Sequence, residues 1–268
     1  MPVTHNIKIK HISEDDFRAL DYKVMELIFS IHKDMGRFWN ENIYQNELAF
    51  RCRDIGFTEI ATEIPIKVSF EDFQKFYYID LLINNGVIYE LKTAKQLTGE
   101  HKNQTLNYLF LMGLHYGKLV NLRPQSVDYS FVSTNITTKK RYEFSIDDRE
   151  WKQLDSDSLW LKQLIIDLLN EWGVFLDTDL FLDAIMHFRG GENNVAKSIE
   201  VVNNQRDALG TQKVHLLNLK TAFRISSMTK DDIYYEQHLY RFIRYTPLKA
   251  IQWINFNRDK IVFKTISR

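Results

Sequence analysis

The stretch YYIDLLINNGVIYELKTA, residues 77–94, decides how we interpret the rest of this 268-residue chain. Its apolar residues fall into two short runs on either side of Asn84–Gly86, which is typical of two strands joined by a tight turn. Asp80 lies in the first run, and Glu90 and Lys92 lie two residues apart in the second. Because side chains alternate between the faces of a strand, Glu90 and Lys92 project from the same side. The stretch therefore predicts a hairpin with an acid on each strand.

The length of the turn decides whether Asp80 shares a face with the other two residues. A three-residue loop, with Gly86 in the left-handed conformation, places Asp80 opposite Glu90. A two-residue turn shifts the pairing and divides the two acids between the faces. A working site requires the first register, and we predict that one.

Two carboxylates and an amine on one face suit the hydrolysis of a phosphodiester. Carboxylates that lie close together repel, and the usual remedy is a hard divalent cation with oxygen ligands. Such a cation is a Lewis acid and activates water, while the lysine can orient that water or stabilise negative charge. The alternative is an exposed Lys-Glu pair on a half-solvated sheet, because a pattern as short as Asp-x(9)-Glu-x-Lys often arises by chance.

The composition, 44% hydrophobic and 26% charged, is that of a soluble globular protein. With 35 basic and 35 acidic residues, the total charge does not indicate nucleic-acid binding, although a neutral total can hide a basic face. The single cysteine, Cys52, excludes an intrachain disulfide and a cysteine-rich zinc site. The amino terminus lacks the apolar core of a signal peptide, and no window reaches the ~18 apolar residues that cross a bilayer. We therefore expect a cytoplasmic protein without membrane contact.

Apolar spacing predicts the elements around the hairpin. Helices are expected over residues 13–34, 40–56 and 98–116. Strands are expected over residues 58–70, 118–123 and 126–135, and Pro65 indicates an edge or a bulge in the first of them. This order predicts an α/β (or α+β) core with a central mixed sheet flanked by helices.

The chain changes character beyond about residue 140. Residues 141–192 hold twelve acids against five bases, whereas residues 193–268 hold thirteen bases against six acids. Helices are predicted over residues 158–173 and 231–245, and strands over 198–203, 212–218, 221–226, 249–256 and 259–266. We therefore predict two domains, residues 1–140 and a carboxy-terminal α+β domain of residues 141–268.

Basic and aromatic residues are interleaved near the carboxyl end of the second domain. The basic residues are Arg241, Arg244, Lys249, Lys260, Lys264 and Arg268, and the aromatic ones are Tyr240, Tyr245, Trp253 and Phe256. Such a combination can hold single strands by stacking and phosphate contact. At these spacings many of the aromatic residues must instead belong to the core.

Several motifs surround the hairpin in a fixed order. They are His32-Lys-Asp-Met-Gly36, Glu41-Asn-Ile-Tyr44, Asp80, Glu90-x-Lys92 and Gln104-x-x-x-Tyr108. In their order and spacing, residues 15–125 resemble the GxxExxY family, in the RecB-like branch of the PD-(D/E)XK nuclease superfamily. That family usually has Gly-Pro-Gly-Leu-Leu before the glutamate, where this chain has Gly36-Arg-Phe-Trp-Asn40. The geometry of this turn is therefore expected to differ.

The resemblance implies a metal-dependent nuclease core. Asp80, Glu90 and Glu41 would bind Mg²⁺ or Mn²⁺, with the backbone carbonyl of Leu91 and the ring of His32 as further ligands. A histidine at the end of a helix is also commonly a cap, which is the alternative for His32.

The resemblance also implies roles for residues around the metal. Lys92 would position or activate the attacking water. Gln104 and Tyr108 lie four apart, so one helical face presents both, and they would support the site and the bound strand. Both Tyr108 and Tyr44 could instead be core residues with a hydrogen-bonded hydroxyl.

Nucleic-acid contacts are expected on the rim of this site. The candidates are Lys95, Lys102 and Tyr44, with His101 and Lys118 nearby. We therefore predict a Mg²⁺-dependent nuclease that acts on DNA, with a homodimer possible. The alternatives are an RNA-directed nuclease, or a non-catalytic module on the same fold that binds nucleic acid or protein.

Overall fold

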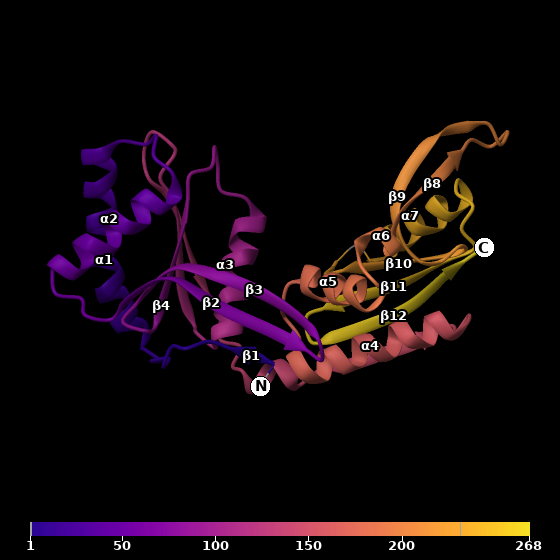
Figure 1. Cartoon of the computed structure of the whole chain (residues 1–268), viewed down its shortest axis with the longest axis horizontal. Coiled ribbons are helices and arrows are strands. Elements are labelled where there is room, and N and C mark those ends of the chain that lie inside the picture. Colours follow the sequence, from indigo (N-terminus) through magenta and orange to yellow (C-terminus); the bar gives the residue numbers. More distant parts are fainter. Residues whose placement is uncertain (1, 231) are drawn as a thin grey trace. The chain divides into compact units, whose positions relative to one another are not determined.

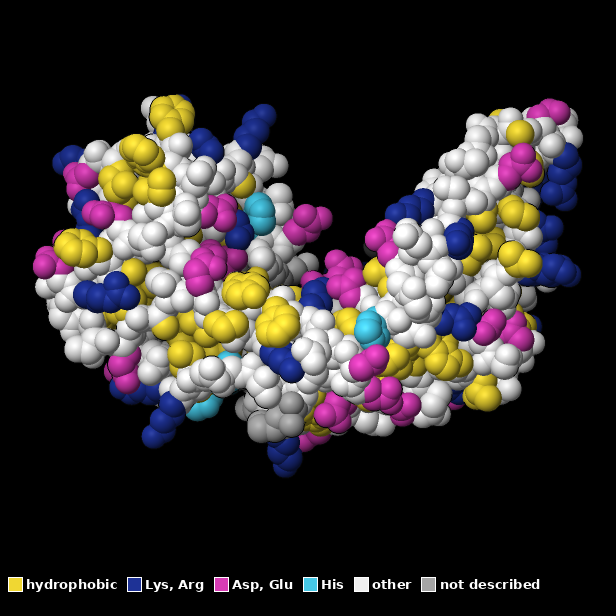
Figure 2. Space-filling view, viewed as in Figure 1, with side chains coloured by type: hydrophobic (Ala, Val, Ile, Leu, Met, Phe, Trp, Pro, Cys, Tyr) yellow, Lys and Arg dark blue, Asp and Glu magenta, His cyan; other side chains and the backbone are white. Residues whose placement is uncertain are grey.

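The computed structural model describes residues 2–230 and 232–268, and these form two α/β units (Figure 1; side chains in Figure 2). Unit 1 consists of Met1–Ser69 and Gln74–Thr138, and unit 2 of Phe70–Phe73 and Lys139–Arg268. Among the described residues, each unit contains a six-stranded mixed sheet flanked by helices, which confirms the predicted fold class. The units differ from the predicted domains, 1–140 and 141–268, chiefly because Phe70–Phe73 belong to unit 2.

The strands of unit 1 are β1 (Val3–Thr4), β2 (Ile60–Phe70), β3 (Phe73–Ile83), β4 (Val87–Lys92), β5 (Tyr116–Asn121) and β6 (Asp128–Ser133), in sheet order β1-β2-β3-β4-β5-β6. β4 and β5 pair in parallel, and both make antiparallel pairs with their outer neighbours β3 and β6. A parallel pair needs a crossover, which α3 (Gly99–Met112) supplies. The carboxyl ends of β4 and β5 therefore lie at the same edge of the sheet.

Two helices cover one face of this sheet. α1 (Glu14–Met35) begins after Ser13, whose Oγ accepts the N–H of Asp16, and it ends at Gly36. α2 (Glu41–Asp54) follows, and the side chain of Asn40, the residue before it, makes no capping hydrogen bond. Buried residues of both helices pack against the apolar face of β3 and β4, formed by Leu81, Ile83, Val87, Tyr89 and Leu91.

The third helix covers the opposite face, as Figure 1 shows. Gly117 of β5 pairs with Ile88 of β4. A Cβ atom on residue 117 would lie 3.3 Å from Thr105 and 3.5 Å from Leu109, which both belong to α3. Side chains alternate along β4, so Glu90 shares this face with Ile88. The polar side chains of β4 thus lie between the sheet and α3.

The hairpin has the predicted register. Leu81 pairs with Tyr89 and Ile83 with Val87, which leaves Asn84–Gly86 as a three-residue loop. Continued by one residue, this register sets Asp80 opposite Glu90. The antiparallel pairing therefore places both acids on one face.

The conformation predicted for Gly86 is wrong. The left-handed residues of the loop are Asn84 and Asn85, each with φ 51°, and asparagine tolerates this region well. Glycine is needed at position 86 because a Cβ there would lie 2.6 Å from the carbonyl oxygen of Lys10. The N–H of Lys10 donates to the carbonyl of Asn85 at 2.9 Å, so the amino-terminal segment lies directly against the turn.

The predicted effect of Pro65 on its strand is confirmed. In the described part of the chain, β1 pairs with β2 only at Lys67 and Val68. Pro65 therefore lies where β2, among the described strands, has no partner on its outer side and forms the edge of the sheet. Two residues earlier, Glu63 has φ 51°, an irregularity within the strand.

The strands of unit 2 are β7 (Ser145–Glu150), β8 (Ala196–Val202), β9 (Ala208–Asn218), β10 (Thr221–Ser226), β11 (Ala250–Asn257) and β12 (Lys260–Ser267), in sheet order β7-β12-β11-β10-β9-β8. Its helices are the 3₁₀ turn η1 (Lys139–Tyr142), α4 (Ser156–Trp172), α5 (Thr178–Phe188), α6 (Glu192–Val195) and α7 (Asp232–Arg244). All the predicted strands and both predicted helices are present with small shifts at their ends, and residue 231, the predicted start of α7, lies outside the described residues. The prediction omitted η1, β7, α5 and α6.

Candidate active site

The central feature of the site is a buried ion pair on β4. Lys92 Nζ donates to Glu90 Oε1 at 2.7 Å, and the Glu90 side chain is only 1% exposed. The second carboxylate oxygen, Glu90 Oε2, is buried and has no hydrogen-bond partner. A buried polar atom without a partner is costly, so this oxygen indicates a missing ligand.

The Asp80 carboxylate lies beside this pair. Asp80 lies one residue beyond the paired region of the hairpin, and its Oδ2 accepts the backbone N–H of Leu91 at 2.8 Å. This hydrogen bond fixes the side chain of Asp80 on the face that carries Glu90.

Burial, reinforced by neighbouring negative charges, raises the pKa of both acids. Burial, reinforced by the negative charge of Asp80, raises the pKa of Glu90 to about 8 despite the opposing charge of Lys92. Burial also raises the pKa of Asp80 to about 6, against the N–H of Leu91 and the charge of Lys92. Without a cation, this face therefore retains protons that solvent-exposed carboxyls would have lost.

Lys92 remains a cation at neutral pH. Burial by itself lowers the pKa of Lys92, but the charge of Glu90 and the hydrogen bond to it outweigh burial, and the pKa is raised. The amine is thus a source of positive charge and a hydrogen-bond donor at this site.

Glu41, the first residue of α2, reaches the carboxyl end of β4. Its Oε1 accepts the N–H of Thr93, the residue after Lys92, at 3.0 Å. The negative charge of Glu41 raises the pKa of both Asp80 and Glu90. Three carboxylates from separate elements therefore interact electrostatically.

α3 carries the last two of the predicted site residues, Gln104 and Tyr108. Gln104 Nε2 donates to the Tyr108 hydroxyl at 2.9 Å, and the Tyr108 ring packs edge-on against Tyr77 of β3. Burial, followed by the negative charges of Glu90 and Asp80, raises the pKa of Tyr108. Gln104 and Tyr108 thus lie on the same side of the sheet as the acids.

Two of the predicted rim lysines suit contact with an anion. Lys95 and Lys102 are both exposed, and neither pairs with a carboxylate in the described part of the chain. His101 has a structural role, because its Nδ1 accepts the N–H of Thr98 in the capping box of α3.

Two predicted contacts to nucleic acid are wrong. Tyr44 is 0% exposed, and its hydroxyl donates to the carbonyl of Gly36 at 2.7 Å, so it stabilises the turn between α1 and α2. Lys118 is buried on the opposite face of the sheet, where its Nζ donates to Asp21 at 2.7 Å. In both cases the position within the fold, and not the residue type, decides the role.

The ring of His32 donates from Nε2 to the carbonyl of Pro124 at 3.1 Å. A carbonyl only accepts, so the proton lies on Nε2, and Nδ1 is the nitrogen left with a free lone pair. Pro124 follows β5, and this contact places His32 at the edge where β4 and β5 end.

The side chains as they stand do not form a preformed metal cage. Across residues 2–230 and 232–268, no group of three or more His, Cys, Asp or Glu side chains is close enough to hold a metal ion. Asp80 and Glu90 nevertheless form an oxygen donor set with one unpartnered oxygen. Mg²⁺ is usually held by one or two carboxylates and keeps several waters, so these residues fit such an ion.

Two residues that sequence reasoning missed also lie at the site. Glu63 of β2 adds a fourth negative charge, which raises the pKa of Asp80 and of Tyr108. Arg123, just beyond β5, donates from Nε to the carbonyl of Thr93 at 3.3 Å. The parallel pairing of β4 and β5 brings Arg123 to the edge that Glu41 occupies, a relationship that a prediction of sheet order would have found.

Fold and site together define a class of protein: a mixed sheet with helices on both faces, which presents Asp and Glu-x-Lys from an antiparallel hairpin. A sequence model of the PD-(D/E)XK nuclease superfamily matches residues 18–131. The matched segment lies within the first part of the chain and includes every residue of the site described above. This match supports the superfamily for that segment, and residues 132–268 lie outside it.

Searches among curated proteins and among solved structures found no match. None of the helices in the described residues combines the length and apolar character needed to cross a bilayer.

Proposed function

We propose that unit 1 is a metal-dependent nuclease that hydrolyses phosphodiester bonds of DNA. The observation that carries the proposal is Glu90 Oε2, a buried carboxylate oxygen without a partner. It shares its face with Asp80 and Lys92, within the segment that matches the nuclease superfamily.

The ligands of Mg²⁺ or Mn²⁺ would be the carboxylates of Asp80 and Glu90 and the backbone carbonyl of Leu91. Glu41 would supply a third carboxylate, and Nδ1 of His32 a further donor. When bound, the cation provides Lewis acidity toward the phosphate and activates a water.

The side chains around the metal have separate tasks. Lys92, held by Glu90, orients the attacking water and stabilises the negative charge that develops on the phosphate. Tyr108 and Gln104 close the site from α3. Arg123, Lys95 and Lys102 contact phosphates that flank the cleaved bond, contacts that position the strand without reading its sequence.

Cleavage assays with matched variants test this proposal. The substrates are linear, nicked and single-stranded DNA, and RNA, each with Mg²⁺ or Mn²⁺. Asp80→Asn and Lys92→Gln should each reduce cleavage by about 100-fold or more, the typical effect of removing a group that stabilises transition-state charge. Asp148→Asn and Lys162→Gln break another Asp-Lys pair, 2.6 Å apart in unit 2, and should leave activity unchanged.

Each alternative predicts a different result. Metal-dependent cutting that persists in both site variants would exclude this assignment of the site. Cutting of RNA alone would identify an RNA-directed nuclease. Binding without cutting under any metal would identify a non-catalytic module.

A further inference from the structure

Unit 2 contains a basic cavity that has no part in the proposed hydrolysis. It has a volume of about 310 Å³ and is lined by Arg206, Tyr240, Ile243, Arg244, Ser267 and Arg268. Three of these residues are arginines and none is acidic. The charge of this cavity therefore favours an anion.

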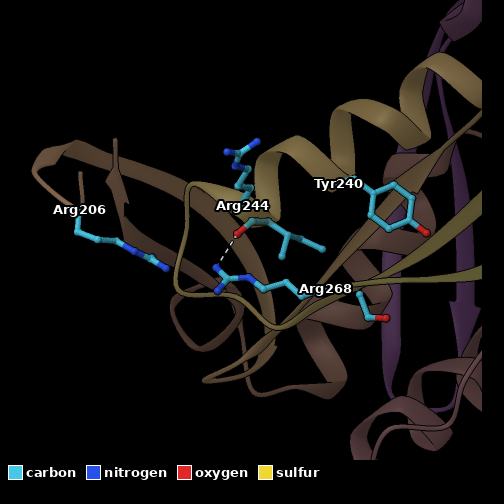
Figure 3. A pocket seen from close by; sticks show the side chains of 6 residues that line it. Arg206, Tyr240, Arg244 and Arg268 are labelled. Atoms are coloured by element: carbon cyan, nitrogen blue, oxygen red, sulfur yellow. Dashed lines mark hydrogen bonds between the residues drawn. The ribbon is translucent and has the colours of Figure 1, made fainter. Parts of the chain in front are cut away.

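Two of the arginines point toward one another. Figure 3 shows Arg206, from the loop between β8 and β9, and Arg268, beyond the end of β12, with their guanidinium groups turned toward each other, whereas Arg244 points away. Arg268 is held in place, because its Nη2 donates to the carbonyls of Ile243 at 2.9 Å and Thr246 at 2.6 Å. Like charges that face one another repel unless an anion lies between them.

No acid in the described part of the chain forms an ion pair with Arg206. The adjacent Asp207 is engaged within its own loop, since its Oδ2 accepts Asn203 Nδ2 at 2.9 Å. In the described residues, neither Arg206 nor Arg268 forms an ion pair. Two guanidinium groups without a carboxylate partner match the hydrogen-bonding pattern of a phosphate.

An aromatic ring accompanies the arginines. Tyr240 of α7 is 46% exposed and lies one helical turn before Arg244. Exposed aromatic rings beside phosphate-binding cations are the usual platform for single-stranded nucleic acid, because every base has a face that can stack.

We propose that this cavity binds a backbone phosphate of single-stranded nucleic acid between Arg206 and Arg268, with a neighbouring base stacked on Tyr240. The site lies in unit 2, outside the segment that matches the nuclease superfamily. It goes beyond the proposed hydrolysis, and it requires neither the metal nor the acids of unit 1.

Binding by the full-length protein tests the phosphate contact. The probe is fluorescein-labelled oligo(dT) of about 15 nucleotides, near the upper size of one site, with EDTA present so that no cleavage occurs. Arg206→Gln is compared with Arg258→Gln. Both arginines are exposed, have positive φ values of 72° and 58°, and lie in turns between consecutive antiparallel strands of unit 2.

The two variants lose the same charge at positions with similar backbone conformation. A difference between their affinities for oligo(dT) is therefore due to the location of Arg206. We expect Arg206→Gln to weaken binding at least about fivefold and to reduce the slope of log K against log salt by about 0.7, the value for one phosphate of a single strand. Arg258→Gln should bind as the wild type does.

A second pair of variants tests stacking. Tyr240→Ala should weaken oligo(dT) binding about fivefold or more, whereas Tyr240→Phe should retain it. Tyr234→Ala, which removes another exposed tyrosine of α7, is the control and should have no effect.

Three outcomes would overturn the proposal. Equal affinities for Arg206→Gln and Arg258→Gln would show that position 206 is not a specific contact. An unchanged affinity for Tyr240→Ala would remove the stacked base. Competition by inorganic phosphate or dTMP as effective as that by unlabelled oligo(dT) would identify a site for small anions. The metal-free assay stays informative even if the nuclease proposal fails, because it compares variants of unit 2 alone.

Discussion

Lys92 Nζ and Glu90 Oε1 lie 2.7 Å apart, so one strand carries a buried ion pair between residues two positions apart. The pair leaves Glu90 Oε2 without a partner, next to a second acid, Asp80. Negative charge on this face therefore exceeds what one lysine can balance. Bound protons or a bound cation must neutralise the remaining negative charge. The first two predictions concern these two possibilities.

The first concerns pH in the absence of metal. The pKa values in the folded protein, about 6 for Asp80 and about 8 for Glu90, lie above the ordinary values of 3.8 and 4.5. Between about pH 4 and pH 8 these two groups thus bind more protons in the folded state than in the unfolded state, so their contribution to the free energy of unfolding falls as pH rises. Urea denaturation with EDTA at a series of pH values measures this slope.

Variants identify the source of that slope. Glu90→Gln should flatten the slope above about pH 6, because it removes the group that titrates highest. Glu143→Gln, at an exposed glutamate of unit 2 whose hydrogen bond to Lys140 lowers its pKa, should leave the slope unchanged. Stability of the wild type that rises over this range would contradict the assignment.

The second prediction concerns the metal itself. Mg²⁺ must displace protons from Asp80 and Glu90, so it should stabilise the protein more at pH 8 than at pH 6. At a concentration 100 times its Kd, a bound ion adds about 2.7 kcal/mol to the free energy of unfolding. Thermal denaturation at constant ionic strength measures the shift in Tm. Glu90→Gln should lose most of that shift, and a shift of equal size in this variant would argue against Glu90 as a ligand.

A third prediction concerns stability on the opposite face of the sheet. Asp21 accepts hydrogen bonds from Lys118 Nζ at 2.7 Å and from the Tyr89 hydroxyl at 3.0 Å, and the Lys118 side chain is 7% exposed. Asp21→Ala leaves a buried cation unpaired and should cost about 3–5 kcal/mol in urea denaturation. Asp34→Ala removes one of the two carboxylate partners of Arg51, at a more exposed site where Glu47 remains paired, and should cost about 1 kcal/mol or less. Similar losses in the two variants would mean that Lys118 finds another partner.

A fourth prediction concerns Arg123. If its guanidinium contacts a substrate phosphate, Arg123→Ala should lower kcat/KM by about tenfold or more, as expected for a charged hydrogen bond worth about 1.5–3 kcal/mol. Arg53→Ala is the control, because Arg53 likewise donates to a backbone carbonyl of unit 1, that of Ile60. Urea denaturation separates the two roles of Arg123: a loss of stability as large as the loss of activity would indicate a purely structural residue.

The sequence predicted the features that depend on neighbouring residues. The helix predicted over residues 13–34 matches α1, which Ser13 and Gly36 delimit through capping, and capping operates within one turn of a helix. The loop Asn84–Gly86 sets the hairpin register, and the register decides that Asp80 and Glu90 share a face. Those elements needed no knowledge of the rest of the fold.

Most of the failures depend on distant segments; the omission of α5 does not, because its cap Asp177 and its apolar spacing are local. Gly86 is required by the approach of Lys10, which no local pattern reveals. The face to which Lys118 belongs follows from its pairing with Tyr89 across β4 and β5. β7 has the polar sequence SIDDRE without apolar alternation, and it becomes a strand through parallel pairing with β12. Arg123 reaches the site because two strands end at the same edge.

The membership of Phe70–Phe73 in unit 2 has a consequence for how the protein can be divided. These residues form the tip of the β2–β3 hairpin, and both Phe70 and Phe73 pack against Trp172 of α4. The chain therefore passes from one unit to the other three times, and no single cut separates them. A fragment ending at residue 138 would retain two phenylalanines that have lost their packing partner. Exchange of the second unit between homologous genes would require a matching change within the first, so the two units are expected to be inherited together.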